Sequence, residues 1–148
     1  MIAAKFSRSR TMLSLIGKAK FGPSAVGRAV SEETSRMVRQ ILQKAVEAGT
    51  GQKAKPAGYS AAGKTGTAQK IDQRTGLYSK EDYVSSFVGF APAGAPKLVI
   101  VVMVDSPVGV TWGGSVAAPV FKAVAEQSLT YLQVRPDDVG GRMLLVSQ

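Results

Sequence analysis

The chain has 148 residues, of which 45% are apolar, and carries a formal net charge of +9. This length allows one domain with a real core, and it is also the size of a piece of a larger domain. The absence of His and Cys excludes Cys/His zinc sites, His-based catalytic triads, thiol chemistry and disulfides. Asn is absent as well, so any chemistry must use Ser, Thr, Lys, Tyr, Arg, acidic side chains or backbone groups.

The positive charges are spread along the chain from Lys5 to Arg142, without a dense run and without interleaved aromatic residues. Nucleic-acid-binding proteins gather basic residues on one patch or stripe. A solvated basic surface is therefore the favoured interpretation, and we predict no nucleic-acid partner. Such a surface would also suit an anionic polymer or a membrane surface.

Residues 1–27 show no clean hydrophobic period and are interpreted as a poorly specified basic leader. The longest apolar run of the whole chain, residues 98–104, is far shorter than the ~20 residues that cross a bilayer. We therefore predict neither a signal peptide nor a membrane anchor in this sequence.

The first regular element is predicted to be a helix that begins after Ser31. Ser is a preferred N-cap residue, and Met37, Ile41 and Ala45 then recur at four-residue steps. Gly49 follows as a natural helix end. This pattern is typical of an amphipathic helix.

Three strand patterns follow, at residues 61–70, 83–90 and 97–105. Turn residues separate them at 72–76 and at 91–96, so the strands follow one another directly along the chain. The nearly continuous aliphatic run of the third pattern is typical of a strand that is covered on both faces.

A second helix is predicted at residues 117–132, with Pro119 tolerated in its first turn. The order helix, strand, strand, strand, helix indicates an α/β (α+β) fold, in which helices flank a three-stranded antiparallel meander. In this fold Phe87 is expected in the core, Trp112 as a packed loop anchor, and Lys70 as a solvated side chain.

The eight residues from Gly58 to Thr65 fit the phosphate-binding pattern G-x-x-x-x-G-K-[ST] letter for letter. A phosphate-binding loop needs an apolar strand before its first glycine and a helix that opens at the Lys-Thr pair. Here Gln52-Lys-Ala-Lys-Pro-Ala57 precedes the loop, and Gly66 would weaken a helix at that point. Nucleotide binding is therefore the less favoured of two interpretations.

The second interpretation treats the same residues as a strand that lines a cleft. Strand alternation places Thr65 and Thr67 on one face and Lys64 on the other. Gly63 and Gly66 make the strand thin, as happens where another backbone or a ligand approaches closely. Two hydroxyls and nearby backbone N–H groups could then bind a carboxylate or a carbonyl, with a lysine beside them.

Neighbouring segments strengthen the second interpretation, because the sequence resembles the class B penicillin-binding proteins, which are peptidoglycan D,D-transpeptidases. The similar segments are residues 31–39, 47–51, 61–70, 83–92 and 112–121, in the family's order. By this resemblance residues 28–136 are the C-terminal part of a transpeptidase domain of the serine β-lactamase-like superfamily, and residues 137–148 are a tail. Residues 64–66 correspond to the family's Lys-Thr-Gly motif.

The resemblance also implies roles for the residues of this strand. Lys64 would assist proton transfer, the backbone N–H of Thr67 would form half of an oxyanion hole, and Thr65, Gly66 and Thr67 would bind substrate. The substrate would be a peptidoglycan stem peptide or a β-lactam, and no metal or organic cofactor is expected. The family is anchored in the cell membrane with its domain outside the cytoplasm.

Two motifs of that family are missing from the sequence. No Ser is followed by Lys three residues later, and a Ser-x-Asn motif is impossible without Asn. We therefore predict that this chain alone is inactive, and that its partners include the missing N-terminal half of the domain or cell-wall synthesis proteins. A non-catalytic binding protein or remnant is the alternative to the enzyme.

Overall fold

The structure is a computed structural model that describes residues 27–138. The chain divides into two compact units, Met1–Val38 and Arg39–Gln148. Helix α1 begins in the first unit and ends in the second, and all of the elements that follow it belong to the second. No helix among the described residues is long and apolar enough to span a bilayer.

Helix α1 spans Glu32–Glu47, close to the predicted bounds. The backbone N–H of Thr34 donates to Ser31 Oγ at 3.1 Å, which confirms Ser31 as the N-cap. In the second unit, Val46 is buried near the end of this helix. The Arg39 side chain donates to the carbonyl of Gly94 at 2.8 Å.

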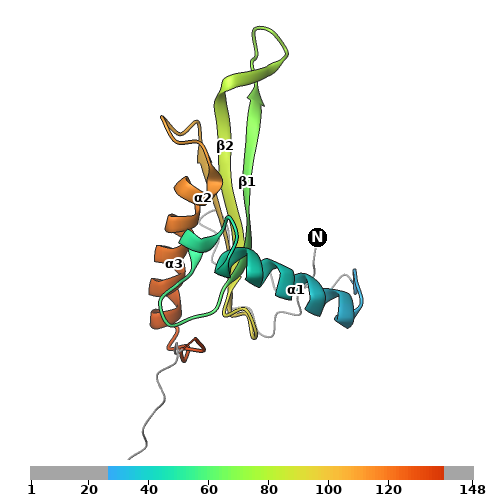
Figure 1. Cartoon of the computed structure of the whole chain (residues 1–148), viewed down its shortest axis with the longest axis vertical. Coiled ribbons are helices and arrows are strands. Elements are labelled where there is room, and N and C mark those ends of the chain that lie inside the picture. Colours follow the sequence, from blue (N-terminus) through green and yellow to red (C-terminus); the bar gives the residue numbers. More distant parts are fainter. Residues whose placement is uncertain (1–26, 139–148) are drawn as a thin grey trace, which may run out of the picture. The chain divides into compact units, whose positions relative to one another are not determined.

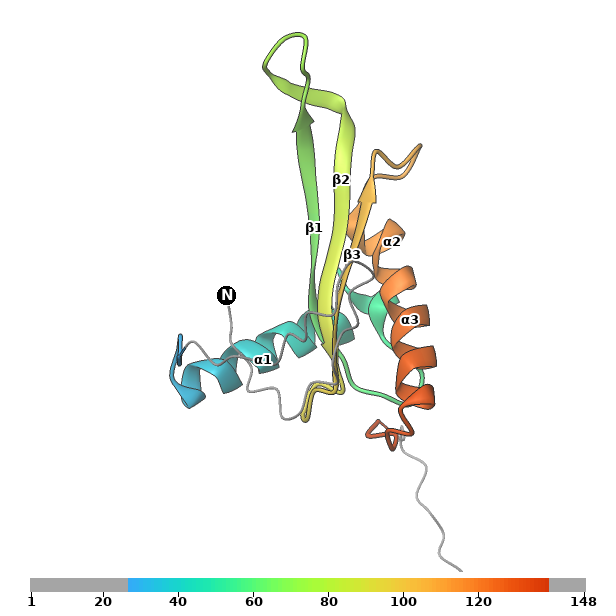
Figure 2. The same cartoon turned by 180° about the vertical axis from the view of Figure 1, so that it is seen from behind.

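Strands β1 (Ala62–Ile71), β2 (Tyr78–Ala91) and β3 (Leu98–Asp105) form an antiparallel sheet in the order β1-β2-β3 (Figure 1). The predicted α+β meander is confirmed. The hairpin of β1 and β2 extends beyond the end of β3, as Figure 2 shows from behind. β2 is longer than predicted because Tyr78, ahead of the predicted start, already pairs with Ile71 of β1.

Within the described residues 27–138, only one face of strand β3 is covered, whereas its aliphatic run predicts cover on both faces. Ile100 and Val102 are half-buried against the core, whereas Val99, Val101 and Met103 are 50%, 60% and 68% exposed. The alternation arises because α3 packs against only one face of the sheet. The expectation was wrong because an aliphatic run predicts a strand but does not show whether other elements pack on one face of it or on both.

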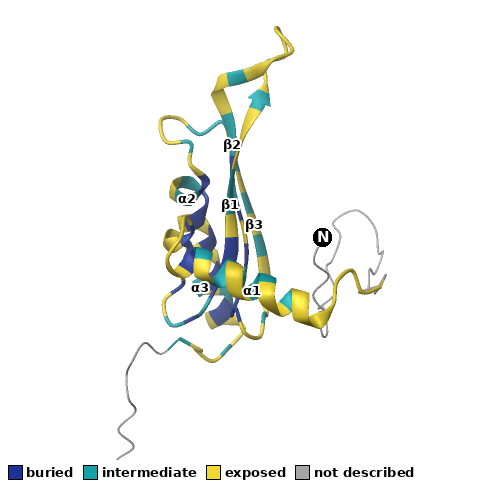
Figure 3. Cartoon of the chain, turned by 45° about the vertical axis from the view of Figure 1, so that its right-hand side comes forward, coloured by how far each residue is buried: buried dark blue, intermediate teal, exposed yellow. Residues whose placement is uncertain are grey.

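Two helices follow β3, where the sequence pattern predicts one. The short α2 (Gly113–Val116) precedes α3 (Ala118–Tyr131), and Pro119 lies in the first turn of α3, as predicted. The rings of Phe87 and Phe121 are fully buried, with centroids 4.8 Å apart. Buried residues concentrate where these helices meet the sheet, and the outer part of the hairpin is exposed (Figure 3).

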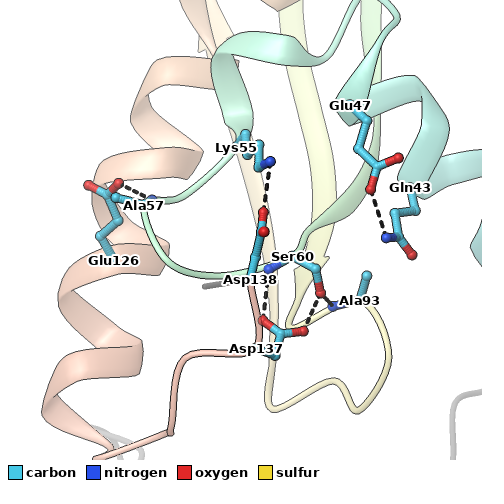
Figure 4. Close-up of polar contacts among 9 residues, drawn as sticks. All are labelled: Gln43, Glu47, Lys55, Ala57, Ser60, Ala93, Glu126, Asp137 and Asp138. Atoms are coloured by element: carbon cyan, nitrogen blue, oxygen red, sulfur yellow. Dashed lines mark hydrogen bonds and ion pairs between the residues drawn. The ribbon is translucent and has the colours of Figure 1, made fainter. Parts of the chain in front are cut away.

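The connector that leads into β1 is held by the end of α3 and the segment after it (Figure 4). Its polar contacts are Lys55 Nζ to Asp138 Oδ2 at 2.7 Å, the Ala57 N–H to Glu126 Oε1 at 2.6 Å, and the Ser60 N–H to Asp137 Oδ1 at 2.8 Å. The 3-10 helix η1 (Gln52–Ala54) lies just before this connector and contacts α3. These contacts fix the entry of the chain into β1.

Candidate functional site

The residues predicted to bind substrate lie on β1, which is an edge strand of the sheet. Thr65 and Thr67 pair with Phe87 and Ser85, whose side chains are buried on the covered face. Lys64, one position out of phase, has its Cβ on the opposite face. The predicted division of these side chains between two faces is therefore confirmed by the register.

The glycines of this segment are sites of close approach. A Cβ on Gly66 would lie 2.5 Å from Ser86 Oγ, and a Cβ on Gly63 would lie 2.5 Å from the Phe87 ring. The backbone that approaches β1 belongs to the start of α2, since a Cβ on Gly113 would lie 2.4 Å from the carbonyl oxygen of Gly66. The expectation of a close backbone approach to this strand is met by α2.

The Thr65 hydroxyl lies beside two polar groups, the Thr50 hydroxyl and the Lys64 ammonium. Its Oγ1 is 3.0 Å from Oγ1 of Thr50, which comes from the turn after α1. Lys64 Nζ donates to the Thr65 carbonyl at 2.9 Å and approaches its hydroxyl at 3.4 Å. The lysine ammonium therefore lies beside the Thr65 hydroxyl, even though its Cβ starts from the other face.

The Thr67 hydroxyl is held from α2. The backbone N–H of Gly113 donates to Thr67 Oγ1 at 3.1 Å. Gly113 is itself buried, and it follows a loop that is tied to the sheet by a hydrogen bond from Ser85 Oγ to the Thr111 carbonyl. β1 and the start of α2 thus share one polar contact, at the residue predicted to carry the oxyanion-hole N–H.

Hydrogen-bond accounting shows what these hydroxyls can do. A threonine hydroxyl has one hydrogen to donate and two lone pairs that accept. Thr65 accepts from Lys64, and Thr67 accepts from Gly113, so neither of these two bonds uses the hydrogen that the hydroxyl can donate, whereas the bond between Thr65 and Thr50 can run in either direction. Two such donors on one exposed strand edge, with an ammonium beside them, are suited to bind a carboxylate.

A second ammonium lies near the start of α2. Lys53, three residues after Thr50, donates from Nζ to Ser115 Oγ at 3.3 Å. It adds positive charge to the segment that joins α1 to β1, and the η1 and α2 elements are in contact. This charge would favour an anionic ligand over a neutral one.

The structure contradicts the phosphate-binding loop. Lys64 and Thr65 lie inside β1, which begins at Ala62, whereas a phosphate-binding loop needs them at the start of a helix. Without a helix N-terminus there, the backbone N–H groups do not converge on one point as phosphate binding requires. The letter match is therefore a coincidence of the glycine, lysine and threonine content of a strand.

Sequence reasoning missed Thr50 and Gly113 as parts of this site. Their signal is weak, because each lies far along the chain from the residue that it contacts. Trp112 was expected to be a packed loop anchor, but 72% of its surface is exposed, since only the next residue packs against the sheet. Lys70, expected to be solvated, has a side chain that is 37% exposed and also forms an ion pair with Asp105 at 2.8 Å.

The described residues 27–138 bring together no group of three or more His, Cys, Asp or Glu side chains that could hold a metal ion. The prediction that no cofactor is used stays a prediction. The chemistry open to the described site is hydrogen bonding and charge, supplied by hydroxyls, ammonium groups and backbone N–H groups.

Comparison with known proteins gives the site a family context. A family described as "Penicillin binding protein transpeptidase domain" matches residues 4–126. The match begins ahead of residue 28, the start that the motifs alone indicate, and so includes most of the segment interpreted as a leader. That segment lies outside the described residues, and the domain limits stay a prediction.

Curated relatives agree with this family match. The chain is 45% identical over 118 residues to the stage V sporulation protein D of Bacillus subtilis, and 41% identical over 116 residues to a probable peptidoglycan D,D-transpeptidase of Pseudomonas aeruginosa. These matches cover 79% and 77% of this chain but 18% and 20% of the relatives. The chain spans about a fifth of their length.

Solved structures give the same result. The transpeptidase domain of penicillin-binding protein 3 from Burkholderia pseudomallei matches with a TM-score of 0.67 and 40% identity, over 80% of this chain and 34% of that one. Penicillin-binding protein 3 from Mycobacterium tuberculosis, solved in complex with ampicillin, matches with a TM-score of 0.70 and 33% identity, over 88% of this chain and 31% of that one.

Proposed function

Because the chain belongs to the penicillin-binding protein transpeptidase family, we propose that β1 is the substrate-binding wall of a D,D-transpeptidase site. Its ligand is the C-terminal carboxylate of a D-Ala-D-Ala stem peptide, or the carboxylate of a β-lactam. The observation that carries the proposal is that Thr65 and Thr67 both accept a hydrogen bond from a protein donor. Thr67 therefore has its hydrogen available for the ligand, and Thr65 has its hydrogen available when Thr50 donates to it.

In the proposed reaction a serine oxygen attacks the carbonyl of the penultimate D-Ala, the terminal D-Ala leaves with a proton, and an acyl-enzyme results. The backbone N–H of Thr67 donates to the oxyanion that forms on that carbonyl. Lys64 adds positive charge beside it and assists proton transfer, and Gly66 leaves room for the ligand backbone. None of these steps needs a metal or an organic cofactor.

This sequence supplies the binding wall without the nucleophile motif, so we propose that the chain alone binds its ligand without being acylated. Intact-mass measurement after incubation with a reporter penicillin tests this, and the mass is expected to stay unchanged. A covalent adduct on any Ser would overturn this part of the proposal. An unchanged mass also fits the alternative of a non-catalytic binding protein, which the binding experiment below separates from a remnant that binds nothing.

The nucleophile would come from the rest of a transpeptidase domain, and we propose this as the partner of the described sheet. Four apolar side chains form an exposed patch on one face of the sheet, called here the open face: Val88, Val99, Val101 and Met103. This chain covers only 34% of a solved transpeptidase domain, so two thirds of such a domain is available to cover an apolar face. Because a relative is named as a probable peptidoglycan D,D-transpeptidase, we also propose that the assembled domain acts on the cell wall, outside the cytoplasm.

A binding experiment tests the carboxylate site. The ligands are acetyl-D-Ala-D-Ala and its C-terminal amide, which differ in the terminal charge, and the readout is the ratio of their dissociation constants from NMR titration. The acid is expected to bind the wild-type chain more tightly. Thr65→Val and Thr67→Val are each expected to lower the affinity for the acid about 10-fold, because each removes a hydrogen bond to a charged group.

The matched control is Thr130→Val on α3, whose hydroxyl donates only to the Glu126 carbonyl of its own helix in the described structure. This variant is expected to keep the wild-type ratio. Equal binding of acid and amide by the wild-type chain would contradict the proposed function.

A further inference from the structure

The hydroxyl of Thr50 lies 3.0 Å from the hydroxyl of Thr65, and the two coordinates alone do not say which oxygen donates. The Lys64 ammonium can only donate, and it approaches the same Thr65 oxygen at 3.4 Å. Thr65 has two lone pairs and one hydrogen. The direction of its bond with Thr50 therefore decides whether the Thr65 hydrogen is donated to Thr50 or is free to be donated to a ligand.

We propose that Thr50 is a positioning residue for the carboxylate site: it donates to Thr65 and so directs the Thr65 hydrogen toward the ligand. The inference rests on the proposed function of β1 and deepens it. With Thr50 and Lys64 both donating, the two lone pairs of Thr65 are filled. The Thr65 hydroxyl is then polarised as a donor, which strengthens its hydrogen bond to an anion.

Thr50 is fixed in place by the backbone around it. A Cβ on Gly114 would lie 2.4 Å from the Thr50 carbonyl oxygen, so the start of α2 lies directly against this residue. On its other side, the N–H of the buried Gly51 donates to the Ala45 carbonyl of α1 at 3.0 Å. The backbone of Thr50 is thus held between the end of α1 and the start of α2, which places its exposed side chain beside Thr65.

The opposite direction of the bond makes the opposite prediction. If Thr65 donated to Thr50, its hydrogen would be occupied, and a ligand carboxylate would have to displace Thr50. Removing the Thr50 hydroxyl would then release Thr65 and strengthen acid binding. The sign of the effect therefore distinguishes the two directions.

Thr50→Val removes the hydroxyl and keeps the shape of the side chain, whereas Thr50→Ser keeps the hydroxyl. With the full chain, acetyl-D-Ala-D-Ala and its C-terminal amide, Thr50→Val is expected to lower the ratio of acid to amide affinity about 3- to 10-fold. Thr50→Ser is expected to restore at least half of the wild-type ratio on a logarithmic scale. Binding of the amide is expected to change less than about 2-fold in both variants, because the effect passes through the carboxylate.

A purely structural role for Thr50 would weaken both ligands equally, and this result would overturn the inference. An increase in acid affinity for Thr50→Val would overturn it as well. Should Thr50→Val fail to fold, Thr50→Ala takes its place with the same expected loss. If the ratio of acid to amide affinity falls in Thr65→Val but not in the Thr50 variants, this inference alone is wrong. If Thr65→Val leaves the ratio unchanged, the proposed function is wrong as well.

Discussion

Both faces of the sheet carry large apolar side chains, but the described helices cover only one of them. On one face, Phe87 meets Phe121 of α3 and both rings are fully buried. On the open face, four side chains are 45% to 68% exposed, those of Val88, Val99, Val101 and Met103, and one end is crossed by the ion pair of Lys70 with Asp105. Thr65 and Thr67 lie on the covered face, where α2 can reach them.

Helices α2 and α3 have two roles on the covered face. They bury the aromatic core, and through the first residue of α2 they hold the Thr67 hydroxyl of the binding strand. The open face has the hydrophobicity of a buried surface and does neither task within the described part of the chain. The site should therefore depend on the covered face and should tolerate changes on the open one.

The largest difference is expected from truncating one residue on each face. Phe121→Ala leaves a cavity beside Phe87 and should destabilise the chain by about 3–5 kcal/mol. Val101→Ala, on the open face, should cost about 1 kcal/mol or less. Urea unfolding followed by circular dichroism measures the loss in free energy of unfolding for both variants. Similar losses at the two positions would contradict the difference in packing between the two faces. If Phe121→Ala does not fold, Phe121→Leu is measured instead.

The next effect concerns the contact of α2 with β1. A Cβ on Gly113 would lie 2.4 Å from the carbonyl oxygens of Gly66 and Ser86, so Gly113→Ala must push the two elements apart. We expect a loss of about 1–3 kcal/mol and a weaker preference for the acid ligand. Gly94→Ala is the matched control, because a Cβ there meets nothing within 4 Å. Equal stability of the two variants would show that α2 does not pack closely against β1 at Gly113.

A dye that binds exposed apolar surface tests whether the open face is accessible to solvent. The wild-type chain is expected to enhance the fluorescence of anilinonaphthalene sulfonate, because the open face exposes a contiguous patch. Val101→Lys together with Met103→Lys should remove most of the signal. The double variant should keep the wild-type preference for the acid ligand. A signal that survives both substitutions would mean that the dye reports another surface.

The smallest effect is expected from the ion pair at the end of the open face. The hydrogen bond and charge of Lys70 hold the pKa of Asp105 below its ordinary 3.8, and the hydrogen bond from Lys70 to Asp105 raises the pKa of Lys70 above 10.5. The carboxylate therefore contributes stability above pH 3.8 that is lost as the pH falls through its lower folded pKa. The ammonium contributes stability that is lost as the pH rises through its raised pKa.

Asp105→Asn tests this pH dependence. Its stability should fall less steeply than that of the wild-type chain as the pH drops below 3.8, because the variant has no proton to take up at this position. Thermal unfolding between pH 2 and pH 7 measures the slope. The effect should be small, since both groups are solvent-exposed. A steeper fall in the variant would contradict the assigned sign.

Much of this fold could be predicted from the sequence, because its signals are local. The cap at Ser31, the alternation of Thr65 and Thr67, and the position of Pro119 depend on residues within a few places of one another. The burial of β3 could not be predicted, because its aliphatic side chains are the same on both faces. Which face is buried depends on the elements that pack against it from elsewhere in the chain. The sequence pattern therefore identified β3 as a strand and misjudged its surroundings.

The candidate site was predictable in part for the same reason. Lys64, Thr65 and Thr67 are neighbours, and their motif is visible in the sequence. Thr50 reaches Thr65 only because the turn after α1 meets the start of α2, and Gly113 reaches Thr67 only because the chain returns after β3. Such contacts depend on how distant segments pack, which no local pattern contains.

The proposed site at the edge of β1 recognises a terminal carboxylate. Titration of the isotope-labelled chain with acetyl-D-Ala-D-Ala, followed through its amide NMR signals, tests this most directly. We expect the largest shifts on the amides of Thr65, Thr67 and Gly113, and smaller shifts with the C-terminal amide of the peptide. Shifts centred on Val101 and Met103 of the open face, or no shifts at all, would contradict it.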